Sequence, residues 1–575
     1  MVRLPTRLRT VLVALILASI FSWFLSRYRH LSNEAKWSEL PAYEQSIPPE
    51  NHEVKDDLKG GLTDEVKGKS KHEIEHNVRG HMKFWREFQP LLMEYAPECD
   101  SPHKLGTAPG IRFDAKNPGE RPELVEMLVD DVIKMRTAHT NFVDAIRDGG
   151  PSLHYTPGTR GLVSTAGGSY LPVLVISLRM LRKTGSNLPM EVFLADADEH
   201  EEYICDVVLP SLNAKCVVLS EILGAAPEDM QIEKYQFKPF AMLFSSFEEI
   251  LFLDADAFPI DKPEVLFDNE PFRSQHMVTW PDFWASSASP LFYAIASQDI
   301  QPMDIRQSTE SGEVVISKKT HAHTLLLCTY YNYWGPSHFY SLLSQGAPGE
   351  GDKETFLAAA SVMKEPFYQV SEPIRAIGHP SSEGFAGSAM VQFHPFDDYK
   401  LTQKEEWRVK GSKAPSPKPF FIHANFPKFN PATVFDKQMV NPAFDDDGNY
   451  TRAWTDPKDT VSDFGRDVER DFWSEIMWTA CELEHRFRSW RSEKDVCSDV
   501  KKYWNAIFAN EKRSVPWMQA VPTASRALEF EMHAAENLWC LMTALQDCRG
   551  FDSRDGSFAL DPAAIARIQS FVLAN

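Results

Sequence analysis

Apolar residues in the middle of the chain occur in short runs that alternate between strand-like and helix-like spacing. Residues 159–168 (TRGLVSTAGG) contain an apolar run that closes on a glycine turn, and Tyr170–Leu181 carries leucines at helical spacing. Met190–Leu194 is a second apolar run, and Gln236–Phe247 predicts a helix before the run that ends at Asp254. This β-α-β-α-β succession predicts a mainly parallel sheet with helices on its faces.

Further along the chain the order of elements becomes mixed. Strands are predicted at His276–Trp280, Glu310–Ile316 and Pro419–Ile422, and an apolar helix is predicted at His323–Tyr333. A glycine-rich loop then passes into another helix at Asp352. These patterns together predict an α/β fold with a mixed sheet.

Helical patterns flank this region on both sides. Apolar residues recur at helical spacing from Ile74 to Leu92 and from Leu124 to Ile146, and the tryptophan-rich tail predicts packed helices. Residues 31–72 are charged and contain Gly-Gly and Pro-Pro steps, which are typical of a stem or linker rather than a core.

The N-terminus predicts a membrane anchor. Val11–Leu25 is a run of 15 apolar or small residues with three arginines before it and two after it. A full span needs about 20 residues, so the run with Thr10 and Ser26 fits a thin bilayer. A cleaved signal peptide is the alternative, but no small-x-small cleavage site follows. The three preceding arginines favour a cytosolic N-terminus, which makes the protein single-pass type II with its main part lumenal.

A chain of 575 residues is too long for one ordinary domain. We expect this order of segments: a cytosolic tail (1–9), a signal-anchor helix (10–26), a stem (27–72), a helical lead-in (73–150), an α/β domain (155–435) and a C-terminal helical region (455–575). The formal net charge of −21 argues against a nucleic-acid partner, which requires a basic surface.

The eight cysteines and one glycosylation sequon fit a secretory lumen. The cysteines show neither Cys-x-x-Cys nor Cys/His zinc spacing. Two disulfides, for example Cys481–Cys497 and Cys540–Cys548, are one arrangement, and buried free thiols are the other. Asn449, in the sequon Asn-Tyr-Thr of an Asp-rich loop, is a candidate N-glycosylation site unless the sequon occurs by chance.

The strongest candidate for chemistry is the acidic pair Asp254 and Asp256, which follows the buried run Ile250–Leu253. Carboxylates that end such a strand lie at the carboxyl edge of the sheet, where open α/β folds bind ligands. Two hard oxygen ligands suit Mn²⁺ or Mg²⁺ bound to a diphosphate, whereas the alternative is an ordinary acidic turn. A second Asp-Ala-Asp triplet at 196–198 runs into a solvated acidic helix start and is the weaker candidate.

Four segments, in this order, resemble the fungal Golgi α-1,2/α-1,3-mannosyltransferases that build mannan branches. They are RGLVSTAGGSYLPVLVISLRMLRKTGSNLPMEVFL (160–194), KPFAMLFSSFEEILFLDADAFPI (238–260), QGAPGEGDKETF (345–356) and FFIHANFPK (420–428). A weaker likeness in FWREFQPLL favours the α-1,2 members. The resemblance implies a GT-A glycosyltransferase fold with a Rossmann-like mixed sheet and retention of the anomeric configuration. It implies a GDP-mannose donor, α-mannoside acceptors on glycoproteins, Mn²⁺ dependence and a type II Golgi membrane topology in protein glycosylation and cell-wall synthesis. It also leaves room for assembly into a Golgi glycosyltransferase complex.

The resemblance assigns metal and donor contacts to several of these residues. Asp254 and Asp256 are expected to hold the Mn²⁺ that bridges the donor diphosphate, and His423 is expected as the third metal ligand. A hydrogen-bonded surface histidine is the alternative for His423. Expected donor contacts are Ser164, Gly167 and Gly168 at the exit of the first strand and the phosphate-directed Lys238 and Lys428, with solvated lysines as the alternative.

Asp352 and Glu354 are the candidates for catalysis at the sugar, because they lie where a flexible loop becomes a helix. Asp352 is interpreted as a nucleophile, an acceptor for mannose hydroxyls or a base toward the incoming hydroxyl, with a helix cap as the alternative. Trp280, Asp282 and Trp284 are candidates for an acceptor platform, although aromatic side chains also build cores.

Two other functions compete with mannosyl transfer. The same fold could use another donor such as UDP-galactose or UDP-glucose, because metal and phosphate contacts read neither base nor sugar. A non-enzymatic lumenal scaffold is the second alternative, and the intact acidic pair argues against it. A glycosidase is disfavoured because it needs two carboxylates around the bond and no divalent ion.

Overall fold

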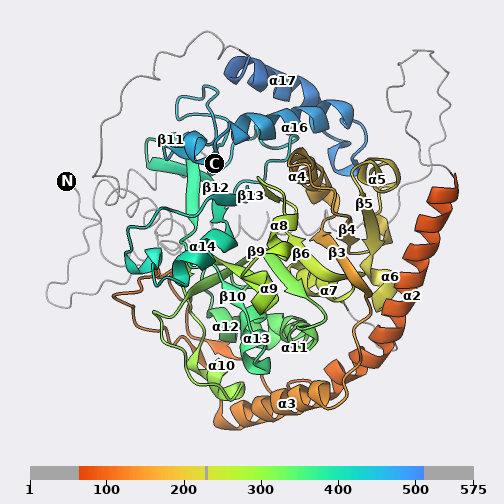
Figure 1. The fold of residues 1–575 in the computed structure, drawn as a ribbon, viewed down its shortest axis with the longest axis vertical. Coiled ribbons are helices and arrows are strands. Elements are labelled where there is room, and N and C mark those ends of the chain that lie inside the picture. The colour runs from red at the N-terminus through yellow and green to blue at the C-terminus, as the bar shows by residue number, and fades with distance from the viewer. Residues whose placement is uncertain (1–63, 227–230, 510–575) are drawn as a thin grey trace, which may run out of the picture. The chain divides into compact units, whose positions relative to one another are not determined.

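The computed structural model describes residues 64–226 and 231–509 (Figure 1). The chain divides into two units, residues 1–68 and residues 69–575, and only the start of helix α2 (Asp64–Glu94) is described in the first unit. The predicted cytosolic tail and anchor, most of the stem, and Cys540 and Cys548 lie outside the described residues. Within the described ranges, no helix has the length and apolarity that a membrane crossing requires.

Helix α2 begins before the first apolar residue of its predicted helical pattern. It begins at Asp64, inside the segment that the sequence assigns to the stem up to residue 72. The first apolar residue at helical spacing is Ile74, but the Lys and Glu residues before it are themselves good helix formers. The hydrophobic pattern therefore marks where the helix becomes amphipathic rather than where it starts.

A seven-stranded sheet forms the centre of the second unit, in the order β10-β8-β9-β6-β3-β4-β5. The strands are β3 (Thr156–Thr165), β4 (Met190–Leu194), β5 (Ala214–Val218), β6 (Phe247–Leu253), β8 (Met277–Ala285), β9 (Gln307–Ser317) and β10 (Tyr368–Gln369). Neighbours β6, β3, β4 and β5 run parallel, whereas β9 is antiparallel to both β6 and β8. The predicted mixed α/β fold is confirmed.

Alternate residues of the central strands enter two cores on opposite faces of this sheet. Leu251 and Leu253 pack on one face, while Ile250 and Phe252 pack on the other. The first core includes helices α4 (Leu171–Lys183), α16 (Val468–Glu482) and α17 (Val496–Ile507), and the second includes α2, α3 (Val129–Arg147), α7 (Phe237–Leu243), α11 (Ala322–Tyr333) and α13 (Thr355–Met363) (Figure 1). A strand covered on both faces explains the continuous apolar run of β6.

A four-stranded sheet, β11-β12-β13-β7, joins the large sheet at the acidic pair. Its strands are β11 (Arg375–Ser381), β12 (Gly384–Phe393), β13 (Pro419–His423) and β7 (Ala257–Pro259). Only residues 254–256 separate β6 from β7, so the chain changes sheets at this turn. Strand β13 pairs antiparallel with β7 and places His423 opposite Ala257.

Short elements connect these layers. They are β1 (His103–Lys104), β2 (Val125–Glu126), α5 (Leu209–Ser211), α6 (Leu219–Leu223), α8 (Glu264–Asp268), α9 (Phe272–Gln275), α10 (Pro290–Ile295), α12 (Tyr340–Ser344), α14 (Pro395–Thr402) and α15 (Thr460–Phe464). Strand β2 corrects the second predicted lead-in helix, which begins only at Val129. Leu124 N instead donates to the side chain of Gln345, and this tertiary contact overrides the local helical pattern.

Two disulfides are present in the described residues. Cys481–Cys497 confirms one of the two suggested pairs and joins α16 to α17. Cys205–Cys216 is an additional bond, which links the short π-helix Ile204–Val208 to β5. Cys99 and Cys328 are free thiols.

Candidate active site

The turn between β6 and β7 positions the acidic pair. Asp254 N donates to Gly312 O at 2.8 Å, and Ala257 N donates to Asp254 O at 3.0 Å. Asp254 remains partly exposed, whereas Asp256 is buried. Ala424 N also donates to Asp256 O at 2.9 Å, so β13 is fastened to the turn just after His423.

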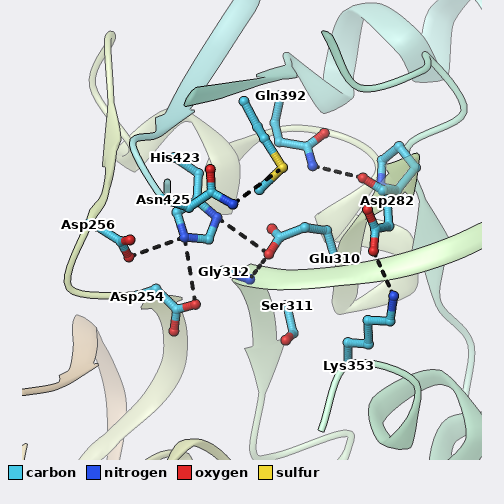
Figure 2. Close-up of polar contacts among 12 residues, drawn as sticks. Asp254, Asp256, Asp282, Glu310, Ser311, Gly312, Lys353, Gln392, His423 and Asn425 are labelled. Atoms are coloured by element: carbon cyan, nitrogen blue, oxygen red, sulfur yellow. Dashed lines mark hydrogen bonds and ion pairs between the residues drawn. The ribbon is translucent and has the colours of Figure 1, made fainter. Parts of the chain in front are cut away.

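His423 lies among three carboxylates. Its Nε2 is 3.1 Å from Asp256 Oδ1 and 3.9 Å from Asp254 Oδ2, and its Nδ1 is 3.4 Å from Glu310 Oε1. Figure 2 shows these side chains converging on the imidazole ring. Burial opposes a charge on His423, but the carboxylates of Asp256 and Glu310 outweigh it and raise its pKa well above the usual value. A cation is therefore favoured at the centre of the acidic cluster.

Glu310 enters the site through an irregularity in β9. Thr279 of β8 pairs with Val314, but the next residue, Trp280, pairs with Glu310. Strand β9 thus carries three extra residues at this point, which is a β-bulge of the kind found beside active sites. Glu310 was not among the site residues predicted from the sequence, although a glycine between two glutamates inside an apolar strand is a signal for a bulge.

The residues present fit a divalent metal ion. One atom each of Asp254, Glu310 and His423 lies within 4.8 Å of the others, and this is the one such group among the described residues. Among the described residues, Glu310 Oε2 and His423 Nδ1 are both buried without a hydrogen-bond partner. Two carboxylates and an imidazole are acceptable ligands for Mn²⁺. The structure therefore brings together Asp254 and His423 as predicted and adds Glu310.

Asp256 lies beside this group but outside it. Its Oδ1 accepts a hydrogen bond from His423 Nε2 at 3.1 Å, and its Oδ2 pairs with the ammonium of Lys428. Burial raises the pKa of Asp256, but the neighbouring charges of His423 and Lys428 outweigh it and lower the pKa. Direct metal ligation by Asp256 stays a prediction, and so does the predicted contact of Lys428 with a phosphate.

Lys238 is buried between the acidic pair and Asp352 rather than solvated. Its Nζ donates to Ser311 O at 2.7 Å and lies 3.1 Å from Asp254 Oδ1 and 3.5 Å from Asp352 Oδ2. Burial opposes its charge, but Asp254 and Asp352 outweigh that effect and raise the pKa of Lys238. The ammonium therefore links the candidate metal site to the candidate sugar site, and its predicted phosphate contact is untested.

Asp352 is a buried side chain of this network and not a helix cap. Its Oδ2 accepts a hydrogen bond from Ser311 Oγ at 2.8 Å, while the N-cap of α13 is Glu354. Burial raises the pKa of Asp352, and Lys238 opposes that rise. The predicted catalytic role of Glu354 is corrected. Its carboxylate accepts hydrogen bonds from Ser308 Oγ and Thr309 N at 2.7 Å and so fixes the start of β9.

The three residues that were predicted to bind the acceptor sugar lie in different environments. Trp280 is fully buried and its Nε1 donates to Phe393 O at 2.9 Å, so it belongs to the core and its predicted role is wrong. Asp282 accepts from Lys353 Nζ at 2.6 Å, as Figure 2 shows. Trp284 is half-buried and stays a candidate for contact with an acceptor.

The glycine turn after β3 lies beside the same site. Asn430 Nδ2 donates to Ser169 O at 3.0 Å, which holds the turn against the segment that follows β13. Gly167 is half-buried and Gly168 is exposed, and their contact with a donor stays a prediction. The predicted donor contact of Ser164 is corrected, because this residue is fully buried within β3 and presents no surface to a nucleotide.

Comparison with known proteins identifies the family. The family model described as "Mannosyltransferase putative" matches residues 159–307 and 298–394. Alpha-1,2-mannosyltransferase MNN2 of Saccharomyces cerevisiae is 33% identical over segments that cover 58% of this chain and 67% of that protein. Alpha-1,2-mannosyltransferase MNN21 of Candida albicans is 31% identical over 66% of each chain. The chain belongs to this fungal mannosyltransferase family.

The matches leave part of each protein unaligned. The chain spans between 58% and 66% of the lengths of three Candida albicans relatives. Among solved structures, the glycosyltransferase GlyE of Streptococcus pneumoniae TIGR4 is 12% identical over 37% of this chain and 45% of that chain. Its TM-score is 0.25, which is too low to support a conclusion.

The mannosyltransferase family match covers most of the site. It includes the glycine turn, Asp254, Glu310 and Asp352, whereas His423 and Lys428 lie beyond its last residue at 394. The pairing of β13 with β7 is what brings these two later residues to the acidic pair.

Proposed function

We propose that the protein transfers mannose from GDP-mannose to α-mannoside acceptors on glycoproteins, with Mn²⁺ and with retention of configuration. Family membership supports mannosyl transfer, and the names of the relatives support an α-1,2 linkage. The GDP-mannose donor and the GT-A fold follow from the sequence resemblance. The observation that carries the proposal is the group of partly exposed Asp254 with buried Glu310 and His423 at the carboxyl edge of β6.

This group is suited to bind a diphosphate through a metal ion. Asp254, Glu310 and His423 would hold the ion, and a bound Mn²⁺ supplies positive charge that stabilises the leaving diphosphate. The side chain of Lys428 is 38% exposed and lies on the glycine-turn side of the site. In this proposal its ammonium moves a short way from Asp256 to contact a phosphate. Lys238 holds Asp254 and Asp352 in place from the buried side.

Asp352 is the carboxylate that faces the sugar in this proposal. Ser311 and Lys238 fix one of its oxygens, which leaves the other for a mannose hydroxyl or the incoming acceptor hydroxyl. Trp284 is half-buried, and in this proposal its indole contacts the acceptor.

We also propose a Golgi location with the catalytic part in the lumen. The predicted anchor supports this topology. The Cys205–Cys216 and Cys481–Cys497 disulfides support it as well, because such bonds persist in oxidising compartments.

The experiment measures sugar transfer by the full chain in detergent. GDP-mannose, UDP-galactose and UDP-glucose are offered with Mn²⁺ and an α-mannoside acceptor, with and without EDTA. We expect transfer from GDP-mannose alone, abolished by EDTA and lowered at least about 100-fold by Asp254→Asn. Asp198→Asn, in the exposed second Asp-Ala-Asp triplet, is the matched control and keeps full activity.

Each other outcome contradicts a defined part of the proposal. Transfer that survives both EDTA and Asp254→Asn removes the metal role. Transfer from a UDP-sugar replaces the donor, and no transfer from any donor favours a lumenal scaffold.

A further inference from the structure

Glu199 lies directly on the backbone of the glycine turn after β3. A Cβ on Gly167 would stand 2.2 Å from Glu199 Oε2 and 2.4 Å from Oε1, so only glycine leaves room for this carboxylate. Ala195 N donates to Oε2 at 2.9 Å, which fixes the carboxylate across the ends of β3 and β4. Within residues 64–226 and 231–509, no hydrogen bond is made to Oε1.

A continuous series of contacts leads from this turn to the candidate metal site. Tyr170 closes the turn and is 47% exposed as a residue, and Lys428 Nζ lies 5.8 Å from the centre of its ring. The same ammonium pairs with Asp256. The Asn430–Ser169 hydrogen bond of 3.0 Å keeps the two segments together.

The order of these groups matches the order of parts in a nucleoside diphosphate. A diphosphate at the metal group and Lys428 places the nucleoside over the glycine turn, because open sheets bind nucleotides across the carboxyl ends of their strands. The ring of the exposed Tyr170 offers a face on which a base or ribose stacks. The base then reaches the far side of the turn, where Glu199 stands.

We propose that Glu199 reads the base of the donor and selects guanine over uracil. Guanine presents N1–H and the 2-amino group side by side, and a carboxylate accepts hydrogen bonds from both. Uracil offers a single N–H between two carbonyl oxygens, which a carboxylate repels. A site built to accept two hydrogen bonds also rejects a base that lacks one of them. This inference rests on the proposed function for the position of the diphosphate.

The test measures nucleotide binding by the full chain with Mn²⁺, using GDP, UDP and IDP, whose hypoxanthine base lacks the 2-amino group. We expect GDP to bind about tenfold to 100-fold more tightly than IDP, because hydrogen bonds to charged groups are the stronger ones. Glu199→Gln shrinks this difference, because GDP loses the acceptor of its 2-amino group as well as the charge beside N1–H, whereas IDP loses only the charge. Glu202→Gln, an exposed change in the same segment, is the control that keeps the wild-type ratio.

The ratio of GDP to IDP separates base reading from a merely structural role, since a distorted turn weakens both nucleotides equally. Equal binding of GDP and IDP by the wild type, or an unchanged ratio in Glu199→Gln, would overturn the inference even if mannosyl transfer is observed. A ratio that depends on Glu199 without transfer from GDP-mannose supports base reading and contradicts the proposed function.

Discussion

Gly312 illustrates how one absent side chain shapes the candidate site. It lies in the bulge of β9, where a Cβ would stand 2.6 Å from His423 Nδ1 and 3.0 Å from Glu310 Oε1. Glycine thus lets the imidazole approach the strand that carries Glu310. The close approach of His423 and Glu310 therefore requires glycine at this position.

Replacement of Gly312 by alanine tests this dependence. We expect Gly312→Ala to displace His423 and lower mannosyl transfer about 100-fold, since a shift near 1 Å is enough for such a loss. The cost in unfolding free energy stays near 1–3 kcal/mol, the range for overpacked sites. Transfer rates and urea unfolding of the purified chain measure the two effects.

Gly106→Ala is the matched control, because a Cβ there meets only Leu124 at 4.0 Å. Wild-type transfer by Gly312→Ala would show that the close approach of His423 is unimportant.

At the scale of elements, the lead-in helix α3 is fastened to the core helix α11 through one buried polar pair. His139 Nε2 lies 2.8 Å from Tyr331 Oη, and the two rings stack at 5.7 Å between centres. Burial lowers the pKa of His139 to about 4 from its ordinary 6.5. The packing of these helices therefore favours the neutral imidazole.

This pair gives the protein a defined acid sensitivity. The pKa of His139 is lower in the folded than in the unfolded chain, so its contribution is fully present above pH 6.5 and is lost as the pH falls toward 4. The loss amounts to at most about 3 kcal/mol. We expect His139→Gln to reduce the difference in unfolding free energy between pH 7.5 and pH 4.5, measured by urea unfolding. An identical difference in both proteins would contradict this assignment.

Pairing between distant strands decided which parts of the site were predictable. Asp254 and Asp352 were found from local signals, a strand end and a loop-to-helix transition. Glu310 was missed because its position depends on the bulge against β8, which apolar periodicity does not reveal. Trp280 was misassigned because the sequence pattern of an aromatic residue at a strand end is the same whether its side chain faces a ligand or the core.

At the scale of the whole molecule, the disulfides and the predicted anchor support the proposed lumenal location. The anchor itself lies outside the described residues, so its test is biochemical. Asn449 is exposed in its acidic loop, where a glycosyltransferase in the secretory lumen can reach it.

Glycosylation reports the compartment of the main part of the chain. We expect the protein from a fungal host to lose one N-glycan on endoglycosidase treatment, seen as a single shift in electrophoretic mobility. Asn449→Gln removes the shift, and a Thr451→Ser variant retains it because the sequon is preserved. A chain without any shift would argue against lumenal exposure of this loop.

The most direct test of the central claim is Mn²⁺ binding by the full chain, measured by calorimetry in the presence of GDP. The account predicts about one site per chain, weakened at least about tenfold by His423→Ala and by Glu310→Ala. His103→Ala, an exposed histidine on β1, leaves binding unchanged. Wild-type affinity in both site variants would contradict the assignment of Asp254, Glu310 and His423 as the metal site.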